Sequence, residues 1–205
     1  MSMAQRERQA LVQTMSAAGP DAPTLCGTWT VRDLAAHLIV RERRPDAAPG
    51  IMLKPFAPYL ERVQDKVAKR PFPQLLDEIA GGPPWLLRPV DSLMNLTEMY
   101  VHHEDVRRAE PGWEPRELSA ADEDRLWKVL TGLSRMAYRK SAVTVALTTP
   151  DGRRTVAHQV GDRTVVLAGK PSELLFHAFG RNAVRLEATG DPADVEAVYA
   201  LDRSV

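Results

Sequence analysis

The sequence predicts an α+β fold, in which a helical unit of about residues 1–140 precedes a small α/β unit of about residues 141–205. Up to residue 140, apolar residues recur at the three- and four-residue spacing of amphipathic helices. After residue 140, β-branched residues alternate with polar ones on both sides of Pro150-Asp151-Gly152, which is typical of a β-hairpin. The change in periodicity therefore places the boundary near residue 140.

In the first unit, prolines and glycines separate the periodic segments. The expected helices cover residues 4–18, 30–44, 59–70, 73–80, 90–109 and 120–140. Thr30 suits an N-cap, and Asp33 three residues later favours the same helix start. Ser119 is the expected N-cap of the last helix. The expected buried stripe of that helix is Leu126, Leu130, Leu133 and Met136.

In the second unit, short strands and short helices are expected to alternate. The hairpin strands lie in SAVTVALTTPDGRRTVAHQV, and further strands are expected in RTVVLAG and AVRLEAT. PSELLFHAFG has a proline at its start and a glycine after its end, which favours a short helix, and DPADVEAVYA is expected to form the closing helix.

Composition excludes several classes of protein. Lys+Arg and Asp+Glu both total 27, and this balance argues against a general nucleic-acid or membrane-surface binder. The N-terminus lacks the apolar core of a signal peptide, and no apolar run reaches the length of a spanning helix, so we expect a cytoplasmic protein. Cys26 is the single cysteine, which excludes an internal disulfide and a multi-cysteine zinc site; we expect it to act as a small buried apolar residue.

Residues 95–109, NLTEMYVHHEDVRRA, concentrate potential metal ligands on one expected helix. Glu98 and His102 lie four residues apart, so both can reach one ion from the same helix face. His103 is rotated by about 100° from His102 and cannot easily join them. Asp105 is close enough in the helix to accept a hydrogen bond from an imidazole N–H on this face. Alternatively, it faces solvent.

Another expected helix, DLAAHLIVRER, offers His37 as a third ligand, and two histidines with one glutamate form a known catalytic zinc arrangement. The plainer alternative is that these histidines are hydrogen-bonded or solvated, as most helical histidines are. Arg107 and Arg108 are expected to be solvated, and His158 and His177 to be structural.

Two motifs resemble the DinB/YfiT-like superfamily, which includes the mycothiol-dependent maleylpyruvate isomerases and mycothiol S-transferases. Cys26, followed by Trp29 to His37, resembles C-x-x-W-[TS]-[VA]-x-D-L-x-x-H-L of its actinobacterial members, and EMYVHHEDVRRA resembles E-x-x-x-H-[HR]-x-D. The segment GKPSELLFHAFGR…VRLEATGD resembles the small C-terminal domain of the isomerase branch, and RERRPDAAPGI resembles an uncharacterised actinobacterial subgroup described as metal-binding.

This resemblance implies a DinB-like four-helix bundle in which His37, Glu98 and His102 hold a divalent metal, expected to be zinc. It further implies that the metal activates mycothiol, a small thiol, for transfer to an electrophile or for an isomerisation. Arg41 and Arg181 are the candidate anion-binding catalytic residues, with Asp105 and His103 as candidate supporting groups. We expect a monomer or homodimer with small-molecule partners. The alternative is a non-catalytic metal-binding or regulatory protein of the same fold.

Overall fold

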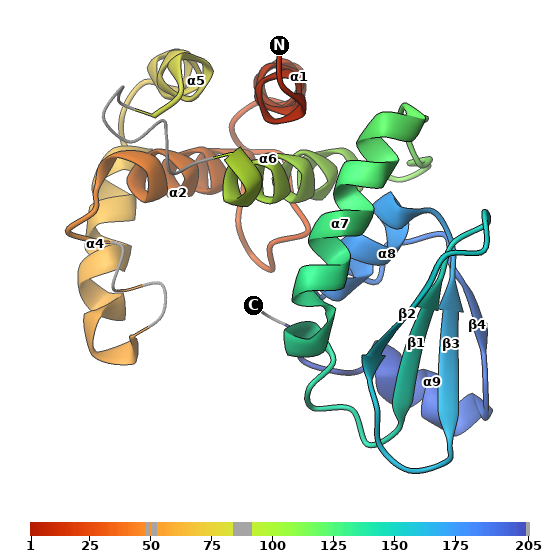
Figure 1. Ribbon diagram of the computed structural model, residues 1–205. Helices are drawn as coiled ribbons and strands as arrows, with labels where there is room; N and C mark the ends of the chain where they lie inside the picture. The colour runs from red at the N-terminus through yellow and green to blue at the C-terminus, as the bar shows by residue number, and fades with distance from the viewer. Residues whose placement is uncertain (48–49, 51–52, 84–91, 204–205) are drawn as a thin grey trace. The chain divides into compact units, whose positions relative to one another are not determined.

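A computed structural model describes residues 1–47, 50, 53–83 and 92–203 (Figure 1). The chain divides into two compact units, Met1–Trp113 and Glu114–Val205. The first unit is helical and the second combines helices with a small sheet, which confirms the predicted α+β class. No helix among the described residues is long and apolar enough to cross a membrane.

The helices of the first unit follow the predicted segments closely. They are α1 (Met3–Ala18), α2 (Val31–Arg43), the 3-10 turn η1 (Lys54–Phe56), α4 (Ala57–Ala68), α5 (Phe72–Gly81) and α6 (Ser92–Arg107). In Figure 1, α1 and α5 are seen almost end-on, whereas α2 and α6 run across the view. The expected start of α6 at residue 90 lies outside the described residues.

Local sequence sets where α2 begins. The Thr30 hydroxyl accepts the backbone N–H of Asp33, while the Asp33 carboxylate accepts the backbone N–H of Thr30. This reciprocal capping satisfies two donors that the first turn cannot pair internally. The start of α2 in turn fixes the position of His37, two turns along the helix.

The core of the first unit is shared by the α-helices named above. Leu11 of α1, Leu38 of α2, Val63 of α4, Ile79 of α5 and Met99 of α6 belong to one buried cluster. Helix α1 packs on α6, and α2 packs on α4 and α5. Helix α6 is buried on most of its circumference from residue 95 to residue 106, so its charged side chains face neighbouring helices instead of water.

The second unit contains α7 (Ala120–Ala137), β1 (Thr144–Thr148), β2 (Arg154–His158), β3 (Thr164–Ala168), α8 (Pro171–Ala178), β4 (Glu187–Thr189) and α9 (Pro192–Tyr199). Within the described residues the strand order is β2-β1-β3-β4, with β1 and β3 parallel and the other pairs antiparallel. Consecutive residues of β1 are buried, as expected for a central strand covered on both faces. Gly152, with φ 85°, forms the predicted hairpin turn between β1 and β2.

Two expectations differ from the structure in this unit. The compact units meet at residues 113 and 114, so α7 belongs to the second unit, where it packs on α8 and β2. The buried stripe of α7 also differs, because Met136 is 42% exposed whereas Ser134 and Ala137 are buried. The helical repeat of 3.6 residues carries the stripe from Leu130 to residues 134 and 137, past Met136.

Candidate metal centre

Three side chains from two helices converge on one point of the first unit. Glu98 and His102 lie one turn apart on α6, and α2 brings His37 against them. The Oε1 atom of Glu98 lies 3.3 Å from His37 Nε2 and 3.2 Å from His102 Nε2. One ligand atom from each residue falls within 4.8 Å of the others, so the three could hold one metal ion together.

The outer nitrogen of each imidazole is bonded to a neighbour, which fixes the orientation of both rings. Gln64 of α4 lies with its Nε2 atom 3.0 Å from His37 Nδ1, and Asp105 Oδ2 lies 2.9 Å from His102 Nδ1. The side chain of Trp29 also packs on His37, with ring centroids 5.1 Å apart. Partners of this kind hold the ring of a metal-binding histidine in one orientation. No sequence pattern indicates Gln64, since its helix is joined to α2 only by tertiary packing.

Burial and hydrogen bonding set the charges of the three groups. Burial lowers the pKa of His37, so this imidazole is neutral. Burial opposes ionisation of Glu98 and His102 as well, yet their hydrogen bonds prevail: bonds with His102 and His37 hold the pKa of Glu98 well below its usual range. Bonds with Asp105, Cys26 and Glu98 raise the pKa of His102 well above its usual range. A carboxylate and an imidazolium therefore face each other.

The spacing of the donor atoms fits a tetrahedral zinc ion. Ligand atoms about 2.0–2.1 Å from such an ion lie about 3.3 Å from one another. The two measured separations from Glu98 Oε1, 3.3 and 3.2 Å, match this value. Two imidazoles and a carboxylate also form a common catalytic zinc set. The residues present therefore fit the metal that the sequence predicts.

Arg41 contacts the same carboxylate from one turn further along α2. Its Nε lies 3.3 Å from Glu98 Oε1, and its Nη1 donates to Asn95 Oδ1 at 2.9 Å. The guanidinium therefore orients Glu98 and is itself held by Asn95, one turn before Glu98 on α6. Asn95 also lines a cavity of about 530 Å³ between the start of α1 and the end of α5.

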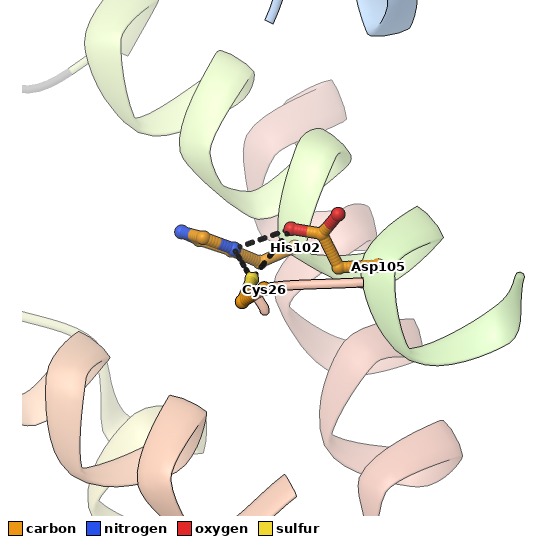
Figure 2. A group of neighbouring side chains, drawn as sticks. All are labelled: Cys26, His102 and Asp105. Atoms are coloured by element: carbon orange, nitrogen blue, oxygen red, sulfur yellow. Dashed lines mark hydrogen bonds and ion pairs between the residues drawn. The ribbon is translucent and has the colours of Figure 1, made fainter. Parts of the chain in front are cut away.

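Cys26 was expected to be a small buried apolar residue; it does pack against the core, but its thiol also has polar partners. Its side chain is half-buried, and its Sγ donates to Asp105 Oδ2 at 3.0 Å and lies 3.7 Å from His102 Nδ1 (Figure 2). Asp105 itself is fully buried. The thiol and the imidazole thus share one carboxylate oxygen, an arrangement that no spacing in the sequence indicates because Cys26 lies in a loop before α2.

His103 points away from the three ligands, in accordance with helical geometry. Its Nδ1 lies 3.0 Å from Glu7 Oε2 and its Nε2 lies 2.9 Å from Thr14 Oγ1, so it joins α6 to α1. His103 and Glu7 are both buried. In the structure, His103 therefore holds two helices together and is not a neighbour of the three ligands.

The arginines that follow on α6 were expected to be solvated, and for Arg108 this is wrong. Arg108 is 3% exposed, donates to the buried Glu104 carboxylate at 2.6 Å and lies over the ring of Trp113. Arg107 is half-buried and pairs with Glu104 as well. The helix is enclosed by its neighbours at this end, so the charges of this segment pair with one another instead of with water.

The other predicted residues lie in the second unit. Arg181 donates through Nη1 to the backbone oxygen of Phe179 at 2.6 Å, just after α8. His158 ends β2, opposite Val145 in the ladder. His177 of α8 is fully buried, with its Nδ1 2.7 Å from the Tyr138 hydroxyl.

Comparison with known families bears on the first unit. Residues 3–88 match the family model described as the mycothiol maleylpyruvate isomerase N-terminal domain. The matched segment includes His37 and Gln64 and ends before Glu98 and His102. Neither the curated proteins nor the solved structures gave a match to this chain. The family match supports the assignment of this chain to the DinB-like, mycothiol-related superfamily.

Proposed function

We propose that His37, Glu98 and His102 bind a zinc ion, and that the protein is a mycothiol-dependent transferase or isomerase. The observation that carries the proposal is the meeting of His37 Nε2 from α2 and His102 Nε2 from α6 at Glu98 Oε1, each at the spacing of zinc ligands. The family match of residues 3–88 supports mycothiol as the thiol. Imidazole and carboxylate donors favour zinc over the harder magnesium and calcium ions.

Neighbouring residues of the chain would orient the two histidine ligands of this site. Asp105 fixes His102 with Nε2 toward Glu98, and Gln64 does the same for His37. Because the Gln64 amide has both a donor and an acceptor end, it can serve either tautomer of His37. A bound zinc ion supplies Lewis acidity, which lowers the pKa of a coordinated thiol.

The two candidate arginines take different roles in this proposal. Arg41 is a positioning residue for Glu98, since its guanidinium contacts that carboxylate and Asn95. Arg181 stays a predicted anion-binding residue on the basis of the family resemblance, and a rise in KM after Arg181→Met is the result that would support it.

Activity is tested with zinc-loaded protein, mycothiol and a bimane electrophile, with the fluorescent thioether as the readout. The expected result is a rate above the uncatalysed reaction that His37→Gln and Glu98→Gln remove. His158→Gln is the matched control, because it replaces a half-exposed histidine of the second unit and should leave the rate unchanged.

Two results would contradict the proposal in different ways. Zinc binding that persists unchanged when His37→Gln and Glu98→Gln are each combined with Cys26→Ser, so that the nearby thiol cannot hold the ion, would rule out the metal centre. Tight zinc binding without any transfer of mycothiol to the bimane, or to other electrophiles of the same kind, would rule out the proposed transferase activity. That second result would support the alternative of a non-catalytic metal-binding protein.

A further inference from the structure

A second group of potential ligands lies directly behind the first. The Sγ atom of Cys26, the Nδ1 atom of His102 and the Oδ2 atom of Asp105 fall within 4.8 Å of one another (Figure 2). The individual separations are 3.7 Å from sulfur to nitrogen, 3.0 Å from sulfur to oxygen and 2.9 Å from nitrogen to oxygen. Sulfur and nitrogen ligands of one tetrahedral zinc ion, with bonds of about 2.3 and 2.05 Å, lie about 3.5 Å apart.

The loop that carries Cys26 is fixed on both sides of the thiol. The backbone N–H of Leu25 donates to the backbone oxygen of Asp105 at 3.0 Å, which ties the loop to α6. The Thr24 hydroxyl accepts the backbone N–H of Cys26 at 3.1 Å and donates to the backbone oxygen of Trp29 at 2.8 Å. The sulfur is therefore held against His102 and Asp105 by the backbone, without help from a metal.

His102 belongs to both groups, through opposite nitrogens of its ring. Its Nε2 faces Glu98 in the first group, and its Nδ1 faces Asp105 and Cys26 in the second. An ion at one nitrogen leaves an N–H on the other, and in either case that N–H points to a carboxylate. The two tautomers of one imidazole therefore correspond to two positions for one ion.

We propose that Cys26, His102 and Asp105 form a second metal site, selective for thiophilic divalent ions such as Cd²⁺ and Zn²⁺, which competes with the first site for His102. On binding, the sulfur–metal and Nδ1–metal bonds form as the thiol S–H and the Nδ1–H release their protons to solvent. The N–H at Nε2 then donates to Glu98. Thiolate ligands select soft ions, whereas the oxygen- and nitrogen-only set of the first site does not.

Cd²⁺ is the probe, because thiolate–cadmium bonds give an ultraviolet charge-transfer band that imidazole and carboxylate ligands lack. The variant His37→Gln/Glu98→Gln removes two ligands of the first site and leaves the second intact. We expect this variant to bind one Cd²⁺ per chain with the full thiolate band. We expect Cys26→Ser to lose the band, although its hydroxyl can still donate to Asp105 and preserve the fold.

A second readout uses the reactivity of the thiol. In the intact protein, saturating Cd²⁺ should slow the labelling of Cys26 by a maleimide at least tenfold, and Mg²⁺ at the same concentration should not. Wild-type protein should bind one ion in total, since the sites share His102. Absence of the thiolate band in the double variant, unprotected labelling, or two ions bound per wild-type chain would each overturn the proposal.

Failure of this proposal can be told apart from failure of the proposed function. Cys26→Ser removes only the second site, and the double variant removes only the first. If the double variant shows no thiolate band while wild-type protein still binds zinc, the second site is absent and the first is unaffected. Unchanged circular dichroism and urea unfolding of both variants verify that each one is folded.

Discussion

His102 and Asp105, three residues apart on α6, are joined by a 2.9 Å hydrogen bond between Nδ1 and Oδ2. This bond turns the other nitrogen of the imidazole toward Glu98, where the first group of ligands meets. Asp105→Asn removes the negative charge behind the ring, and we expect it to weaken zinc binding by about 10- to 100-fold. Competition with a chromophoric chelator measures this change. Asp65→Asn, on the exposed face of α4, is the control and should bind zinc normally.

Zinc binding should strengthen as the pH rises. Bonds with Asp105, Cys26 and Glu98 outweigh burial and raise the pKa of His102 well above its usual range, so the metal-free site carries a proton at Nε2 that an ion must displace. The metal-free form holds more protons than the bound form, so affinity increases with pH until this proton is lost. From about pH 6.5, the ordinary pKa of an imidazole, upward we therefore expect the affinity for zinc still to increase with pH. An affinity that does not change over this range would show that His102 binds no proton in competition with zinc.

His177 makes the second unit sensitive to acid. Burial, together with the charge of Arg203, lowers the pKa of His177 to about 3, so the folded chain keeps this imidazole neutral. The unfolded chain takes up a proton below about pH 6.5, and it therefore binds more protons than the folded chain. The contribution of neutral His177 to the free energy of unfolding is therefore complete above about pH 6.5 and is lost as the pH falls toward about 3.

Urea unfolding at neutral pH and at about pH 5 measures this dependence, which should amount to about 2 kcal/mol for a single buried imidazole. In His177→Gln the free energy of unfolding should fall less between neutral pH and about pH 5, because the amide does not titrate. The amide can still accept a hydrogen bond from the Tyr138 hydroxyl. His158→Gln, in the same unit, should leave the decrease unchanged. Equal decreases in the two variants would mean that another group is responsible.

A buried ion pair between α1 and α2 should be more important for stability than an exposed one. Arg8 pairs with Glu42 and also donates to the backbone oxygen of Ile79 at 3.0 Å; both charged side chains are buried. Glu42→Gln leaves the guanidinium without its countercharge, and we expect it to lower the free energy of unfolding by about 3–5 kcal/mol. Urea titration measures the loss. Asp46→Asn, which breaks an exposed pair with Arg44, is the matched control and should have little effect.

Local signals in the sequence predicted most of the helices and strands. The N-cap at Thr30 and the hairpin turn at Gly152 depend on residues close by in the chain, and both predictions are confirmed. The unit boundary and the exposure of Met136 depend on which helix packs against which sheet, and periodicity alone does not contain that information. The burial of Arg108 was missed for the same reason, since its contact with the ring of Trp113, beyond the end of α6, is a tertiary one.

In the candidate site too, local spacing predicted some residues, whereas others are brought in by tertiary packing. Helical spacing placed Glu98 and His102 on one face of α6 and rotated His103 away from them, and the structure has them so. The sequence offered His37 only as a possible third ligand, and the resemblance assigned it, because no spacing links two helices that lie far apart in the chain. Gln64, Asn95 and Cys26 were not predicted as parts of the site, and the first and last of them approach it only through tertiary packing. Asn95, one turn before Glu98, is the only one of the three whose spacing in the sequence indicates its place.

The adjacent histidines of α6 give the most direct test of the metal centre. His102 faces Glu98 and His37, whereas His103 is bonded to Glu7 and Thr14 of α1. Zinc titration of the variants His102→Ala and His103→Ala, each verified as folded, compares two positions that differ by one residue. The account predicts that His102→Ala loses tight zinc binding and that His103→Ala keeps it while being less stable to urea. Tight binding retained in His102→Ala, or lost in folded His103→Ala, would contradict it.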